Sequence, residues 1–584
     1  MTSSRPWPRS EPEFLFSIIP RWGNTVPPAR FLCLSKQILM DIMSCPDLNC
    51  KYMVCKVSES RPDVLESRDS VVQGGSSVVI GMLVVLYLAI ADFLFFAGWT
   101  TPVCLFVFCA ALFAILLTYC KSPGHVMPME KTFTQSSGLC ISVLIIGVFF
   151  VIGGVVGWFP THGDSWAFRQ ALFLNLKDAA WPLVLPDGRE MTYYLAGMLP
   201  AAMLGRVLPE CLTQWAVWLW IVGALTAMLL VVSRFRGTNI VLFTILALGF
   251  QDPLRAVFRP NATFGQGRGF MAEVLQFFQN LTGVDCSVLV TYYGNQTLMA
   301  PIYNCVGAYN SVPAALLAAM ALVFFRRVPW MIPVVIGLLV PISPLGAIAC
   351  MPVAAYYFLS GISWRRLLSV LFPLFVAGVS AVYFLRADSS MNVVTAAWIA
   401  RGPEFWIFYV RYLVGSSFLL VPLYPFRKKD GLYWIVTISA ILMPCLFIGS
   451  LPDLPVFHGF NEFFLKGSVV YSLFICLMWC QEWSKMNKYV RAGALLWAVL
   501  STVVYCSSQI KGWDAQRTVA DMWNGHLYHN RVFLRQSVPS TKAPAIPGVI
   551  LQRSGESLDY FPGGAFPEAK GVDYSGEPHP QAFP

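Results

Sequence analysis

The sequence predicts an all-α integral membrane protein, a polytopic bundle of helices that crosses the bilayer many times. Hydrophobic residues make up 56% of the 584 residues and charged residues only 12%, whereas a soluble domain usually carries about 25% charged residues. Apolar runs also recur along the chain, and a run of about 20 residues is long enough to cross the hydrocarbon core as a helix. Composition and run length together predict the fold class.

The apolar runs are bounded by charged residues, Pro or Gly, and they give about 13 candidate spans, several of them short and interrupted by Pro. We therefore expect a multi-span domain over 76–508. Its clearest spans cover 78–99, 102–120, 139–159, 215–232, 367–385 and 432–450.

Basic residues predict the orientation, because short loops rich in Lys and Arg stay in the cytosol. With a cytoplasmic N-terminus, the long segments 160–212, 253–310, 386–403 and 451–467 and the tail 509–584 fall on the outer side. We expect a multi-pass protein, most simply of a bacterial inner membrane. The basic clusters that then share the cytosolic side are Arg234/Arg236, Arg326/Arg327, Arg365/Arg366, Arg427/Lys428/Lys429 and Lys485/Lys488/Arg491.

The two ends of the chain differ from the multi-span domain. Residues 1–75 have no hydrophobic period and no signal-peptide pattern, so we expect a cytosolic segment, either a small cap or a disordered lead-in. The tail 509–584 becomes polar and rich in Pro and Gly, which predicts little core of its own. Cys286 and Cys305 in the 253–310 loop are able to pair in an oxidising compartment, and the sequence leaves this open. The net charge of +10 suits loops that face anionic lipid and does not indicate nucleic acid.

The first outer loop opens with the stretch GWFPTHGDSWAFRQALF (157–173), which places His162 and Asp164 at the outer mouth of the third span. Residues 166–177 then mix apolar residues with Arg169 and other polar ones, a pattern typical of a helix that lies in the interface with its apolar face toward lipid. An ionisable residue at the membrane is a candidate site residue. Asp is also a favoured N-cap residue, so the alternative is that Asp164 only caps the predicted helix and has no role in a site.

Further motifs follow in two other blocks. The first loop continues through Trp181-Pro182 and Tyr193-Tyr194 to a short helix that contains Pro. A late block, 458–477, places Asn461-Glu462-Phe463 just before Lys466 and the next span. The segment 340–359 contains Ser343-Pro344, which predicts a helix break without a chemical role. Over about 160–500, these blocks are similar to blocks in large bacterial membrane proteins of the GT-C class of glycosyltransferases.

The resemblance implies an enzyme that moves a sugar from a polyprenyl-phosphate carrier to an acceptor hydroxyl, on a glycan or a lipid, at the outer or lumenal membrane face. Many GT-C enzymes have two acids close together in the first loop. Here the residue two positions before Asp164 is His162, which argues against a carboxylate-bound divalent metal. The lipid-linked sugar donor is then the expected ligand, and Asp164 is the expected general base.

Cations must neutralise the departing polyprenyl phosphate, and Arg and Lys commonly bind phosphate. Some of the substrate-binding candidates also have a structural alternative. Lys466 suits a snorkelling anchor or a partner for Glu462 four residues before it, and the tyrosine pair suits an aromatic belt at the interface. The substrate-binding candidates are His162, Arg169, Tyr193, Tyr194, His458, Asn461, Glu462 and Lys466.

The alternative function is a transporter or flippase for a lipid-linked or amphipathic solute. Short helices interrupted by Pro favour it, because transporters build substrate sites from broken helices. Arg411 inside a predicted span favours it too, since a charge there should face the bundle interior or a water-filled cavity. The chain shows no repeat that relates its halves, which speaks against this function. A structural subunit without catalysis is a third alternative. The sequence contains no P-loop or HExxH motif.

Overall fold

A computed structural model of the chain describes the greater part of the expected multi-span domain. The predictions for 1–65, and for most of the 253–310 loop, 451–461 and the tail, fall on residues outside the described part. The structure describes residues 66–121, 133–156, 164–183, 190–191, 193–209, 212–235, 237–250, 298, 300–360, 363–384, 392–401, 404–427, 431–450, 462–511 and 540–541.

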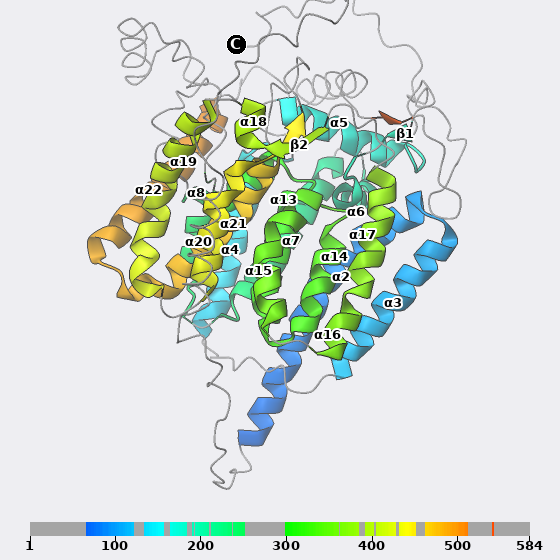
Figure 1. Ribbon diagram of the computed structural model, residues 1–584, viewed down its shortest axis with the longest axis horizontal. Helices are drawn as coiled ribbons and strands as arrows, with labels where there is room; N and C mark the ends of the chain where they lie inside the picture. Colours follow the sequence, from blue (N-terminus) through cyan, green and yellow to red (C-terminus); the bar gives the residue numbers. More distant parts are fainter. Residues whose placement is uncertain are drawn as a thin grey trace, which may run out of the picture. The chain divides into compact units, whose positions relative to one another are not determined.

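Helices dominate these residues, which confirms a mostly helical fold (Figure 1). The α-helices are α2 (Glu66–Trp99), α3 (Pro102–Lys121), α4 (Phe133–Ile152), α5 (Asp164–Asp178), α6 (Leu199–Val207), α7 (Thr213–Val232), α8 (Ile240–Gly249), α12 (Pro301–Gly307), α13 (Val312–Phe324), α14 (Ile332–Leu339), α15 (Pro344–Leu359), α16 (Trp364–Ser369), α17 (Leu371–Phe384), α18 (Ala397–Arg401), α19 (Glu404–Leu420), α20 (Gly431–Leu442), α21 (Glu462–Glu482) and α22 (Lys488–Lys511). Short 3-10 helices are η2 (Ala196–Met198), η4 (Phe325–Arg327), η5 (Pro329–Met331), η7 (Val421–Phe426), η8 (Met443–Cys445) and η9 (Trp483–Lys485).

Several helices have the length and apolar composition of membrane spans. Within the described residues, four are long and apolar enough to cross a bilayer: Ser77–Trp99, Pro102–Lys121, Thr213–Val232 and Arg366–Phe384. They coincide with four of the clearest apolar runs of the sequence. Shorter apolar helices accompany them, including Pro344–Leu359. The membrane character is thus supported, whereas the count of about 13 spans remains a prediction.

Two of the expected spans end early. The run 139–159 is helical only to Ile152, in α4. The run 432–450 is helical to Leu442 and then passes through η8 into strand β3 (Leu446–Ser450). Pro444 explains this second break, because proline has no N–H for a helical hydrogen bond and its ring clashes with the preceding turn.

Two small sheets correct the all-α prediction. Strand β3 pairs antiparallel with β2 (Asn392–Ala396), whose β-branched Val393, Val394 and Thr395 favour a strand. Strand β1 (Glu190–Met191) pairs antiparallel with β4 (Ser540–Thr541). The sheets therefore join segments that are far apart in the sequence, and β4 brings residues 540–541 to residues 190–191.

Helix α5 exists as expected but does not lie on the surface. Leu172, Phe173, Leu174 and Leu176 are all buried, so apolar side chains are covered on more than one face of the helix. A neighbouring cation holds its C-terminal end, since Arg206 of α6 donates hydrogen bonds to the carbonyl oxygens of residues 176, 177 and 179 at 2.6–2.9 Å. Basic side chains commonly bind the last carbonyls of a helix in this way. The prediction that these apolar side chains face lipid is wrong, because they are buried inside the protein and α6 packs against α5. That α5 lies at the membrane interface stays a prediction.

Helix α13 lies at the centre of the bundle. Every residue of this helix is buried, and it packs against α7, α14, α15 and α21. Its sequence VPAALLAAMALVF is apolar on all sides, as expected for a fully enclosed helix. Its alanines allow neighbouring backbones to approach closely. The N-termini of α13 and α15 lie at the same end of the bundle as α5 and β2, and α16 lies at the opposite end (Figure 1).

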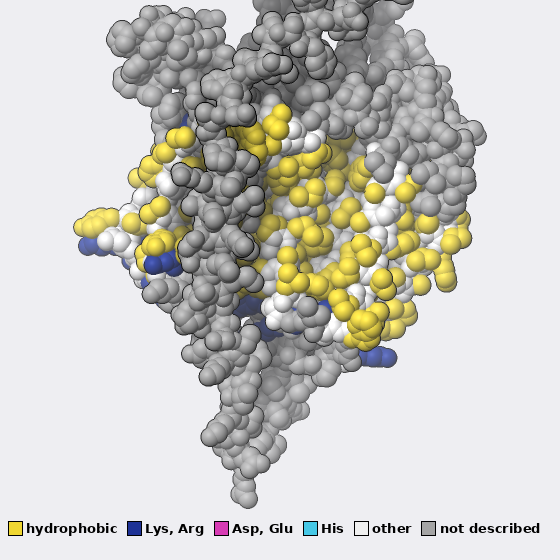
Figure 2. Space-filling view, in the orientation of Figure 1, with side chains coloured by type: hydrophobic (Ala, Val, Ile, Leu, Met, Phe, Trp, Pro, Cys, Tyr) yellow, Lys and Arg dark blue, Asp and Glu magenta, His cyan; other side chains and the backbone are white. Residues whose placement is uncertain are grey.

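The outside of the bundle carries many exposed apolar side chains, and Figure 2 shows them as a broad yellow surface. On α3, Val103, Phe106 and Phe113 are 65–72% exposed. A soluble protein rarely exposes apolar patches of this extent, so we take this surface to be the one that contacts lipid. In the same view the Lys and Arg side chains gather at its lower end.

Tight packing between α8 and α22 gives a prediction for stability. A Cβ atom added at Gly249 would collide with the carbonyl oxygen of Ala498 and lie 2.5 Å from Thr502 Oγ1. Gly249→Ala should therefore destabilise the protein by about 1–3 kcal/mol, the usual cost of overpacking. The measurement is thermal unfolding of the detergent-purified chain.

Gly378→Ala in α17 is the matched control, because an added Cβ there meets no described atom within 4 Å. It should be neutral, or stabilising by up to about 1 kcal/mol through helix propensity. Equal melting temperatures for the two variants would contradict the packing of α8 against α22.

Candidate functional site

The structure brings the first outer loop and the late block together. The Nζ atom of Lys466 contacts the hydroxyl of Tyr194, a residue 272 positions away, and lies 3.8 Å from the centre of its ring. The Tyr193 and Tyr194 rings stack with their centres 3.9 Å apart. One predicted site residue of the late block thus contacts Tyr194 of the first loop, and Tyr193 stacks on that tyrosine.

The Lys466 side chain is enclosed. It is only 3% exposed, one turn inside α21, so its ammonium does not reach bulk solvent as a snorkelling anchor would. Burying an unpaired ammonium costs several kcal/mol, and a cation over a tyrosine ring recovers part of that cost. The contact with Tyr194 is therefore one physical reason that Lys466 can be buried.

A second cation, Arg169, lies in the same region. Arg169 of α5 is 7% exposed, and its Nε donates a hydrogen bond of 2.9 Å to Oδ1 of Asn310. The neighbouring Tyr309 interacts electrostatically with both Arg169 and Tyr193. Burial raises the pKa of the Tyr309 phenol well above its ordinary value, Arg169 opposes this shift and Tyr193 adds to it. Arg169, Tyr193 and Tyr309 therefore belong to one cluster.

Tyr383 holds the first-loop tyrosines in place. Its hydroxyl accepts a hydrogen bond from the backbone N–H of Tyr193 at 3.1 Å and donates one to the Tyr193 carbonyl oxygen at 3.0 Å. The hydroxyl belongs to the buried Tyr383 of α17, so a helix long and apolar enough to span the membrane sets the position of the tyrosine pair. We name the set Arg169, Tyr193, Tyr194, Tyr309, Asn310, Tyr383 and Lys466 the cationic cluster.

Other predicted site residues are only partly described. His162, His458 and Asn461 lie outside the described residues. Asp164 and Glu462 are the first residues of α5 and α21, and for both the structure describes the backbone alone. Asp164 precedes Arg169 by five residues of one helix, about 7.5 Å along its axis. Whether these five side chains join the cationic cluster remains a prediction.

Three members of the cluster were missed by sequence reasoning. Tyr309 and Asn310 lie at the end of the 253–310 segment, in which the sequence predicted no site residue, and Tyr383 lies at the end of the apolar run 367–385. Residues 301–307 of the same expected loop form α12, with Cys305 buried in it. Cys286 lies outside the described residues, so its pairing with Cys305 stays open.

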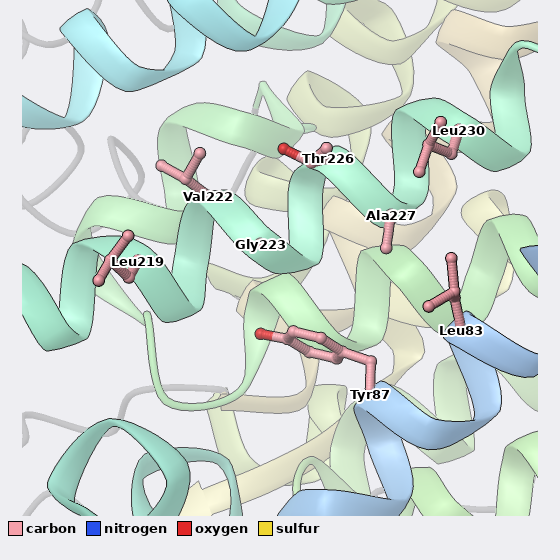
Figure 3. Close-up of a pocket in the computed structure, with 8 residues that line it drawn as sticks. All are labelled: Leu83, Tyr87, Leu219, Val222, Gly223, Thr226, Ala227 and Leu230. Carbon is pink, nitrogen blue, oxygen red and sulfur yellow. The ribbon is translucent and has the colours of Figure 1, made fainter. Parts of the chain in front are cut away.

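A groove of about 390 Å³ opens between α2 and α7, away from the cluster (Figure 3). Leu83 and Leu219 on its walls are 47% and 50% exposed, and its polar lining consists of Tyr87 and Thr226. No member of the cationic cluster lines it. We read it as a crevice in the lipid-facing surface.

Metal binding finds no support in the described part of the chain. Among those residues, no three His, Cys, Asp or Glu side chains are placed to hold one ion. The cluster instead gathers amino, guanidinium, hydroxyl and amide groups, which are suited to an anionic ligand.

The anchoring role of Tyr383 can be tested by removing its hydroxyl. Tyr383→Phe leaves both backbone groups of Tyr193 without that partner, and we expect a loss of about 1–3 kcal/mol in the free energy of unfolding. The matched control is Tyr87→Phe, which removes a single hydrogen bond to the Trp220 carbonyl oxygen. Thermal unfolding should show the larger loss for Tyr383→Phe, and an equal or smaller one would refute the anchoring role.

Comparisons of the chain with protein-family models, with curated proteins and with solved structures find no match.

Proposed function

We propose that this protein is a membrane glycosyltransferase that moves a sugar from a polyprenyl-phosphate carrier to an acceptor hydroxyl at the outer or lumenal membrane face. The observation that supports this best is the buried contact between Lys466 and Tyr194. It joins the two sequence blocks expected to bind substrate. It also provides a cation at that contact, which in this proposal binds the phosphate of the lipid-linked donor.

The reaction makes one bond and breaks another at the anomeric carbon of the sugar. The acceptor oxygen attacks that carbon, and the bond from the carbon to the phosphate oxygen breaks. The phosphate leaves with the electron pair, and Lys466 and Arg169 stabilise its negative charge. The Asp164 carboxylate takes the acceptor proton as general base.

The tyrosine pair and the helix arrangement support binding of the rest of the donor. Tyr193 and Tyr194 present an aromatic surface on which a sugar ring can pack, and Asn461 and Glu462 supply hydrogen-bonding groups to the sugar hydroxyls. The polyprenyl chain lies in the lipid beside the bundle. The acceptor, a glycan or a lipid alcohol, approaches Asp164 from the aqueous side.

A transporter is the second candidate function, and one observation favours it. Asp92 in α2 is fully buried, and neither of its carboxyl oxygens has a hydrogen-bond partner within the described residues. Ionisable residues inside membrane spans often mark a path for ions or substrate. Arg411 of α19 likewise has its Nε and Nη2 atoms shielded from the outside, as expected for a residue that faces the bundle.

One assay separates the two functions. Membranes that contain the full chain are incubated with farnesyl-phosphate-linked tritiated hexoses, and transfer of tritium from the carrier to acceptors is measured. Asp164→Asn should lower the transfer rate by about 100-fold or more, because general-base catalysis contributes about that much. Lys466→Met should raise the KM for the donor by roughly 10-fold or more, the value of a hydrogen bond between charged groups.

Asp92→Asn is the control in the transfer assay and should leave the rate unchanged. In liposomes, movement of a fluorescent farnesyl phosphate between leaflets tests transport directly. Loss of this movement in Asp92→Asn, together with unchanged hexose transfer in Asp164→Asn, would refute the glycosyltransferase function and support the transporter function.

A further inference from the structure

Helices α13 and α15 begin next to each other, at the end of the bundle that carries the cationic cluster. A Cβ atom added at Gly346 would lie 2.8 Å from the Cβ of Ala315 and 2.6 Å from Ser343 Oγ. Glycine at 346 thus allows the first turn of α15 to touch the first turn of α13. Both helices carry Pro at one of their first two positions.

The residue that precedes each helix is a buried serine. Ser311 and Ser343 are 0% and 1% exposed. An N-cap serine usually accepts a hydrogen bond from a backbone N–H of its own first turn, but neither side chain does so here. Within the described part of the chain, neither hydroxyl has any hydrogen-bond partner. Buried polar groups in native proteins are nearly always satisfied, so these two hydroxyls point to a ligand.

Asn310 adds a third group of the same kind. It is 1% exposed, and its Oδ1 already accepts the hydrogen bond from Arg169. This bond fixes the orientation of the amide, and it leaves Nδ2, which can only donate, without a partner among the described residues. Gly197 of η2 packs directly on the Asn310 backbone carbonyl, so the residue cannot easily move away.

Hydrogen-bond donors and positive charge surround this point. The first-turn N–H groups of a helix lack intrahelical acceptors, and a helix N-terminus carries about half a positive charge. Here the N–H of Val312 already bonds to the Ala308 carbonyl oxygen, and the two prolines have no N–H. The first-turn donors are therefore those of Ala314, Leu345 and Gly346. Two such ends meet here, from helices of 13 and 16 residues. Arg169 binds Asn310. Helix α21, which carries Lys466, packs on α15, since a Cβ added at Gly467 would be 3.4 Å from the Cβ of Ala349.

We propose that Asn310, Ser311, Ser343 and the N-termini of α13 and α15 form a binding site for a phosphate mono- or diester. Helix N-termini with backbone N–H donors bind such anions in many proteins. This assigns a role to Ser343-Pro344, which the sequence marked only as a helix break. The assignment of the phosphate to the lipid-linked donor rests on the proposed function, and the site itself does not.

Binding to the detergent-purified full chain tests the site. The probes are geranyl phosphate, its neutral counterpart geraniol, and inorganic phosphate, each measured by isothermal titration calorimetry. We expect geranyl phosphate to bind at least about 10-fold more tightly than geraniol, and Ser311→Ala/Ser343→Ala to weaken it by about 10-fold or more, since hydrogen bonds to a charged group are lost. Binding of inorganic phosphate with the same dependence on the serines would assign the site to free phosphate as well.

The same double variant should melt at or above the wild-type temperature, because it removes buried hydroxyls that have no partner in the described structure. Ser142→Ala in α4 is the matched control: this serine is equally buried and its hydroxyl equally unpartnered among described residues, but it lies inside a helix. It should not change binding of geranyl phosphate. Wild-type affinity in the double variant, or an equal loss for geraniol, would overturn the site.

The outcome is separable from that of the proposed function. If geranyl phosphate binding depends on the two serines while no hexose is transferred, the site stands and the glycosyltransferase proposal fails. If hexose is transferred and the double variant binds geranyl phosphate normally, the site alone is refuted.

Discussion

The burial of two positive charges is the constraint on which the outer end of this bundle depends. Lys466 and Arg169 are 3% and 7% exposed, and a buried charge costs several kcal/mol unless nearby groups compensate. Tyr194 contributes to the compensation of Lys466, and Asn310 to that of Arg169. These partners come from distant parts of the chain, so the charges can be buried only when the outer segments are assembled in one arrangement.

The helices of the bundle supply that arrangement. Helix α13 is enclosed on all sides and begins at Val312, so it fixes the positions of Tyr309 and Asn310 just before its first turn. Helix α17 contributes Tyr383, which ties the backbone of Tyr193 to the bundle. Helix α21 packs on α15 and carries Lys466. The loop residues are therefore held by rigid elements, as a binding site requires.

The sequence predicted the elements well where hydrophobicity decides the structure. The runs 102–120 and 215–232 match α3 and α7 within two residues, because a long apolar stretch has few alternatives in a membrane. The run 432–450 failed because hydropathy does not register the break at Pro444 or the pairing of β3 with β2. Strand pairing depends on a partner about 50 residues away, which a local pattern cannot contain.

Only part of the site could be predicted from the sequence, because a local pattern does not contain contacts between distant segments. Arg169, the tyrosine pair and Lys466 stood out as polar or aromatic residues beside spans, and their types suggested phosphate and sugar. Nothing in the sequence distinguished Asn310, Ser311 or Ser343 from ordinary loop and N-cap residues. Their importance lies in burial without a partner among the described residues, and that property arises only when α13 and α15 meet.

A double-mutant cycle on Tyr194 and Lys466 tests the central contact most directly. The free energies of unfolding of Tyr194→Leu, Lys466→Met and the combined variant are compared with that of the unaltered chain. If the ammonium packs on the ring, the two changes should be coupled by about 1 kcal/mol or more. Effects that add within about 0.5 kcal/mol would show that the first outer loop and the late block do not meet, and would contradict the account.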